Sequence, residues 1–104
     1  MHFEVDANKL TNLLTAEVVA ALGFHYNIQN HMEAIEATEE EDYLVGLGKV
    51  IAYNKRNLNL HLQRAAILLQ LVGEFDEDSD KLEVYAIEAK VAALKKRFGI
   101  KEGE

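Results

Sequence analysis

A long stretch of helical periodicity runs through the middle of the sequence, between Tyr43 and Gly73. Residues that face one side of a helix recur there at alternating steps of three and four: Leu44, Leu47, Ile51, Asn54, Leu58, His61, Ala65, Leu68 and Val72. This spacing predicts one continuous seam, the row of side chains that a helix turns toward a neighbouring helix. The sequence has no proline, so nothing in the stretch forces the helix to end early.

Two further stretches keep helical spacing. Asp6 is a candidate N-cap for a helix over about residues 7–37, with a seam of Leu10, Leu14, Glu17, Ala21, Phe24, Ile28, His31 and Ile35. Thr38 with Glu41 and Asp80 with Glu83 have the spacing of capping boxes, which mark helix starts. Glycine is favoured just past a helix end, and Gly73 and Gly99 occupy such places. We therefore expect helices at about 7–37, 39–72 and 80–98.

These elements predict an all-α fold: an antiparallel three-helix bundle with two long helices and one shorter C-terminal helix. A length of 104 residues without a linker-like segment predicts a single helical domain over residues 1–104. The third helix follows Gly73 after a short connection, so we expect it to run antiparallel beside residues 55–73 and to cover one half of the hairpin.

Composition excludes several classes of function. The sequence has no cysteine, which rules out disulfide scaffolds, thiolate metal sites and cysteine nucleophiles. A net charge of -7 disfavours nucleic acid as a partner. No apolar run approaches the roughly 20 residues that span a bilayer. We expect a cytoplasmic protein with no membrane association and no cofactor.

The two long seams place two polar residues at the same level. If the hairpin turns near Thr38, then Glu17 lies opposite His61. One interpretation is a buried polar pair that fixes the helix register. The other is a catalytic base that is poised by its neighbour, and this function requires a cleft.

Several apolar side chains lie beyond the reach of the short third helix. They are Tyr26, Met32, Tyr43, Val50 and Tyr53, together with Val45. Large exposed apolar patches are uncommon on soluble monomers, so these residues predict a partner interface that a homodimer would bury. The alternative is that they face water singly, as many surface apolar residues do.

Two groups of residues are candidates for a metal site. Glu17, His61, His31 and His25 could supply ligands, but the predicted register separates them by one to two turns and no Glu-x-x-His motif is present. Asp76, Asp78 and Asp80 match the first ligands of a calcium loop, but the glycine and the bidentate glutamate of such a loop are missing. We therefore expect no metal.

The string Arg56-Asn57-Leu58-Asn59-Leu60-His61 resembles the Arg-Asn-x-x-x-His motif of HEPN domains. Members of that family are all-helical, often dimerise and often act as ribonucleases. The resemblance implies that Arg56 and His61 would be a catalytic pair, with His61 as acid or base and Arg56 stabilising phosphate charge.

Two functions follow as hypotheses. The first is a small acidic protein-interaction or assembly module that is not an enzyme and acts as a homodimer, since heptad seams and an uncovered apolar end are the strongest signals. The alternative is a HEPN-like ribonuclease that uses Arg56 and His61.

Overall fold

The computed structural model describes residues 6–100, which form three helices and their connections. Helix α1 spans Ala7–Glu36, α2 spans Glu41–Gln70 and α3 spans Val84–Arg97. There is no strand within residues 6–100. The predicted all-α architecture, with two long helices and one shorter C-terminal helix, is confirmed.

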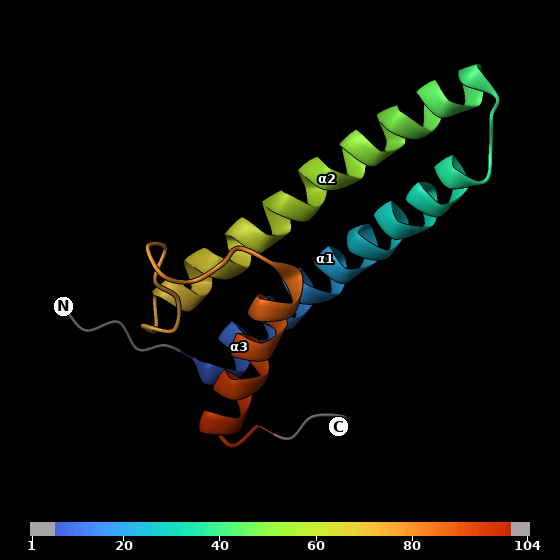
Figure 1. Ribbon diagram of the computed structural model, residues 1–104. Coiled ribbons are helices and arrows are strands. Elements are labelled where there is room, and N and C mark those ends of the chain that lie inside the picture. Colours follow the sequence, from blue (N-terminus) through green and yellow to red (C-terminus); the bar gives the residue numbers. More distant parts are fainter. Residues whose placement is uncertain (1–5, 101–104) are drawn as a thin grey trace.

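Helices α1 and α2 lie side by side as an antiparallel hairpin, and the molecule is 58 Å long in this direction (Figure 1). Residues 37–40 join the two helices at one end, which we call the tip. At the other end, the base, α1 begins, α2 ends and α3 packs against the hairpin (Figure 1).

The main hydrophobic core lies at the base, where three helices meet. Its buried members are Leu10, Leu14, Val18, Ala21, Leu62, Ala65, Ala66, Leu69, Val84, Ile87, Val91 and Leu94. The half of the hairpin near the tip has only two helices, and its buried apolar side chains are Ile28, Leu47 and Ile51. Burial of apolar area is the main stabilising term in folding, so the base is expected to be the more stable half.

Three helix termini have the capping residues that the sequence predicts. The Asp6 carboxylate accepts a hydrogen bond of 3.1 Å from the backbone N–H of Lys9, as an N-cap does. Gly73 and Gly99 have φ angles of 73° and 72°. At each, the N–H groups of the glycine and of the next residue donate the pair of backbone hydrogen bonds that defines a Schellman motif, for example Gly73 N–H to Gln70 O at 3.1 Å and Glu74 N–H to Leu69 O at 2.9 Å.

Two predicted helix starts are wrong. The Thr38 hydroxyl accepts a hydrogen bond from the N–H of Glu40 at 3.3 Å, within the connection itself, and α2 begins only at Glu41. Asp80 does not cap α3, because its carboxylate binds the N–H of Asp76 and the ammonium of Lys90. Helix α3 consequently begins at Val84.

The direction of α3 also differs from the prediction. Tyr85, in the first turn of α3, contacts His25 in the middle of α1, with ring centroids 5.3 Å apart. Arg97, in the last turn, pairs with Glu74 just beyond the end of α2. Helix α3 therefore runs toward the base, antiparallel to α1 and in the same sense as α2 (Figure 1). The reason is the connection over residues 71–83, which turns back along the hairpin before α3 starts.

Candidate functional site

Helix α2 carries a second heptad-spaced series beside its seam. In the half of α2 near the base, α3 covers one flank, and Leu62, Ala66 and Leu69 are buried there. The opposite flank carries Tyr43, Gly46, Val50, Tyr53, Asn57, Leu60, Arg64, Ile67 and Leu71, again at steps of three and four. The six large apolar side chains of this series are between 40% and 70% exposed. No other helix of the described chain covers them.

The matching flank of α1 is built from small residues. At heptad spacing it carries Leu13, Ala16, Ala20, Gly23, Asn27, Asn30 and Ala34. Leu13 is the large apolar member, and it is 47% exposed. We call this flank of α1 and the exposed flank of α2 together the open face.

Two hollows lie along the open face. One of about 490 Å³, near the tip, is bordered by Asn30, His31, Ala34, Asp42, Tyr43, Gly46, Leu47 and Val50. The other, of about 300 Å³ and nearer the base, is bordered by Leu13, Glu17, Arg64, Ile67 and Leu68. Both combine residues of α1 and α2, so the open face is a shallow apolar groove that follows the hairpin rather than an enclosed cleft.

The structure separates the residues that the sequence grouped as a partner interface. Tyr43, Val50 and Tyr53 lie on the open face. Tyr26 lies on another side of α1, where its ring approaches His25 at 5.7 Å. Met32 is 52% exposed and belongs to the flank of α1 that faces α3 nearer the base.

Sequence reasoning missed Leu60, Ile67 and Leu71 as part of the same surface. Their signal was present in the sequence as the second series of three-and-four steps, parallel to the seam. It was overlooked because these residues lie in the half of α2 that the third helix was expected to cover. In the structure α3 covers one flank of that half and leaves the other exposed.

Glu17 and His61 meet between α1 and α2, at the edge of the open face. The Nδ1 atom of His61 lies 2.5 Å from Oε2 of Glu17, and the two side chains are 20% and 21% exposed. The ring of Phe24 stacks on His61 with centroids 5.6 Å apart and an interplanar angle of 16°. The pair is thus half-buried, and the hollow that Glu17 borders is lined mainly by apolar side chains.

Arg56 does not join His61. The two residues are five positions apart on one helix, which places them about 140° apart around its axis. Arg56 is exposed, whereas His61 turns inward onto Glu17 and Phe24. A phosphate that contacted His61 would therefore have no guanidinium of Arg56 beside it in the same chain.

The other histidines are held at separate places. His31 Nδ1 lies 2.5 Å from the backbone oxygen of Asn27. His25 packs edge-on against Tyr26 and Tyr85, and its Nε2 atom is buried without a hydrogen-bond partner. Residues 6–100 contain no group of three His, Asp or Glu side chains that could hold a metal ion.

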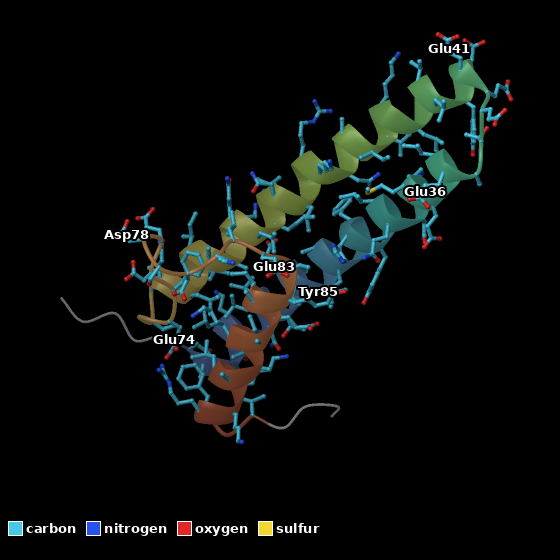
Figure 2. All side chains as sticks on the ribbon, in the orientation of Figure 1. Glu36, Glu41, Glu74, Asp78, Glu83 and Tyr85 are labelled. Carbon is cyan, nitrogen blue, oxygen red and sulfur yellow. The ribbon has the colours of Figure 1, made fainter. Side chains whose placement is uncertain are left out.

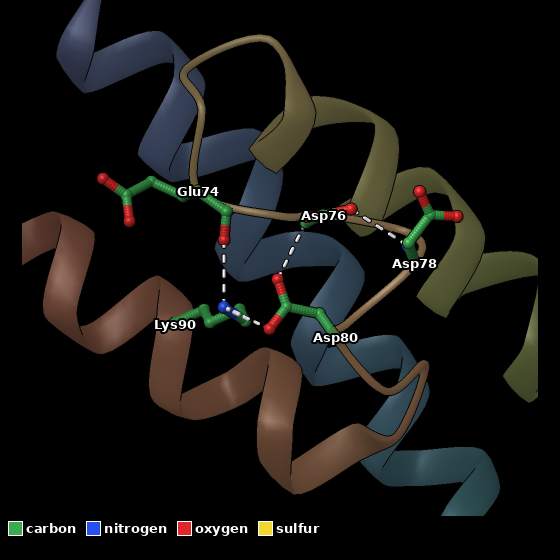
Figure 3. A network of polar contacts seen from close by, with 5 residues as sticks. All are labelled: Glu74, Asp76, Asp78, Asp80 and Lys90. Atoms are coloured by element: carbon green, nitrogen blue, oxygen red, sulfur yellow. Dashed lines mark hydrogen bonds and ion pairs between the residues drawn. The ribbon is translucent and has the colours of Figure 1, made fainter.

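The acidic connection is organised as a closed turn, as Figure 3 shows. The Asp80 carboxylate accepts a hydrogen bond of 2.8 Å from the N–H of Asp76, and the Asp76 carboxylate accepts one of 3.0 Å from the N–H of Asp78. Lys90 of α3 lies 3.1 Å from Asp80 and donates a 3.0 Å hydrogen bond to the backbone oxygen of Glu74. These contacts hold the turn to α3.

Two side chains in this region have shifted pKa values. The N–H of Asp76, and then Lys90, stabilise the charged Asp80 carboxylate and lower its pKa. Asp80 thus favours the folded state at pH values above its ordinary pKa, and this contribution is lost as the pH falls through the lowered one. Partial desolvation, followed by the neighbouring Tyr26, raises the pKa of Tyr85.

Comparisons with protein-family models, with curated proteins and with solved structures found no match. Among the helices of residues 6–100, none is sufficiently long and apolar to cross a membrane. The open face is accordingly the feature of the described chain on which a functional proposal can be based.

Proposed function

We propose that the protein is a non-enzymatic interaction module that assembles as a homodimer through its open face. The observation that carries this proposal is the row of large apolar side chains on the uncovered flank of α2, each at least 40% exposed. Contiguous exposed apolar surface of this kind marks interaction sites in soluble proteins.

The dimensions of the open face suit a stable dimer. Each long helix has 30 residues, which corresponds to a length of about 45 Å. Two helices side by side, each about 10 Å wide, present about 900 Å². A dimer that used this face would bury about 1,800 Å² in total, which is the size of an ordinary specific interface.

A second copy also fits the architecture of the hairpin. Two hairpins packed by their open faces would form a four-helix bundle, in which every long helix has two neighbours. The ribonuclease hypothesis has weaker support. Arg56 lies about 140° around the helix from His61, and the Glu17 carboxylate already contacts Nδ1 of His61.

Light scattering on the purified protein tests the proposal, and we expect twice the mass of one chain at micromolar concentration. The variant Tyr53→Glu, Leu60→Glu places charges on the open face and is expected to be a folded monomer, since a buried unpaired charge is costly. Circular dichroism should show that its helix content is retained.

The matched control is Val19→Glu, Val45→Glu. These two valines are as exposed as the test pair, at 63% and 55%, but lie outside the open face. The control should remain dimeric. A monomeric wild-type protein, or equal loss of the dimer in both variants, would refute the role of the open face.

A further inference from the structure

We propose that the two copies pack with their tips at opposite ends, so that α2 lies against α2 of the second copy and Asn57 lies on the two-fold axis. This inference rests on the proposed dimer and specifies its geometry. Two hairpins can stack by their open faces in two symmetric ways. Tips at opposite ends place α2 on α2, whereas tips at the same end place α2 on α1.

The open series of α2 has matching spacing on the two sides of Asn57. Counted outward from this residue, Tyr53 corresponds to Leu60, Val50 to Arg64, Gly46 to Ile67 and Tyr43 to Leu71. The steps alternate between three and four in both directions, so an antiparallel copy brings these pairs to the same levels. The Ile67 side chain then meets a glycine, which leaves space for it.

The polar group at the centre distinguishes the two arrangements. The Nδ2 atom of Asn57 donates a hydrogen bond of 2.9 Å to the backbone oxygen of Tyr53, which leaves Oδ1 and one N–H available. On the two-fold axis these groups can pair with those of the second Asn57. With tips at the same end, Asn57 would lie near Gly23 of the other copy, which has no side chain to accept or donate.

Repulsion between the tips disfavours the other arrangement. The tip carries Glu33, Glu36, Glu39, Glu40, Glu41 and Asp42, and no Lys or Arg lies between Glu33 and Asp42. Glu36 and Glu41 extend from this end in Figure 2. Tips at the same end would gather the carboxylates of both copies. Tips at opposite ends are about 45 Å apart, well beyond the Debye length of about 8 Å at physiological salt.

Because the sequence has no cysteine, engineered cysteines can test this geometry without interference. A disulfide needs Cα atoms within about 7 Å of each other. A single cysteine can therefore link to the same cysteine of the second copy only near the two-fold axis. Asn57→Cys is expected to form a covalent dimer under mild oxidation. The control is Asn59→Cys, because Asn59 is exposed on another side of α2. Its disulfide should form on the order of a hundredfold more slowly, because the dimer does not hold the two thiols near each other.

A mixture of Gly23→Cys and Asn57→Cys proteins tests the other arrangement. The added side chain at Gly23 meets no atom within 4 Å, so the substitution fits the fold. A rapid mixed disulfide without self-linked Asn57→Cys would overturn the proposed orientation and leave the dimer intact. Equally slow linkage of Asn57→Cys and Asn59→Cys, with a dimeric mass by light scattering, would overturn the orientation as well. A monomeric mass would instead refute the dimer itself.

Discussion

Glu17 and His61 are two polar side chains placed between helices that are otherwise held together by apolar contacts. The two side chains form a carboxylate–imidazole pair, and the ring of Phe24 stacks on one side of the imidazole. The sequence predicts that Glu17 and His61 lie opposite each other, because an antiparallel hairpin with a turn near Thr38 allows few registers. The stacking of Phe24 did not follow, since it depends on side-chain rotamers that spacing does not specify.

We predict that Glu17 and His61 are energetically coupled. Glu17→Leu and His61→Leu should each lower the free energy of unfolding by about 1–2 kcal/mol, because each leaves a half-buried polar group without its partner. The double variant should be no less stable than either single variant, since both polar groups are then removed. Urea denaturation at one fixed protein concentration measures these differences.

Asn59→Leu is a suitable control for this cycle, because Asn59 is exposed on α2 away from the pair. Its effect should be within about 0.5 kcal/mol of zero. If the losses of the two single variants instead add up in the double variant, the two side chains do not stabilise one another.

At the scale of the elements, the ends of the helices were predicted better than their beginnings. Gly73 and Gly99 end α2 and α3 because both need a positive φ, which glycine adopts without cost. The starts of α2 and α3 were misjudged because Thr38 and Asp80 bind groups other than the expected helix N–H groups. The competing partner of Asp80, Lys90, is distant in sequence, so local pattern could not reveal it.

Gly48 inside α2 and Gly73 just beyond its end should respond in opposite directions to substitution by alanine. Gly73→Ala is expected to destabilise the protein by about 1–2 kcal/mol, because its φ of 73° is strained for a residue with a Cβ atom. Gly48→Ala, inside α2 and with nothing within 4 Å of the added Cβ, should stabilise it by about 0.5–1 kcal/mol. Thermal unfolding of both variants provides the measurement, and a shift of the same sign in both would contradict this account.

At the scale of the whole molecule, the hairpin has one half supported by α3 and one half supported by two helices alone. The all-α class and the order of two long helices followed by a shorter one could be predicted, since both depend on periodicity and on the absence of proline. The direction of α3 could not, because it depends on how residues 71–83 fold back through contacts such as Lys90 with the Glu74 oxygen. The extent of the open face could not be predicted either, because it depends on which flank of α2 the third helix covers.

We predict that the dimer protects the half of the hairpin near the tip. Amide hydrogen exchange over residues 41–58 should slow as the protein concentration rises, because dimerisation adds packing where only two helices meet. Exchange over residues 62–69, which already pack on α3, should change less. In the Tyr53→Glu, Leu60→Glu variant the concentration dependence should disappear. A uniform change along α2 would show that the dimer does not act on this half preferentially.

The short connection at the tip lets α1 and α2 of one chain pack against each other. Residues 37–40 contain neither glycine nor proline, and the extended backbone of Glu40, with ψ of 114°, interrupts the helical path there. If this connection became helical, α1 and α2 would fuse into one rod, and two rods could exchange their second halves while preserving the α1–α2 contacts. A few residues at the far end of the molecule thus separate a closed hairpin from a domain-swapped one.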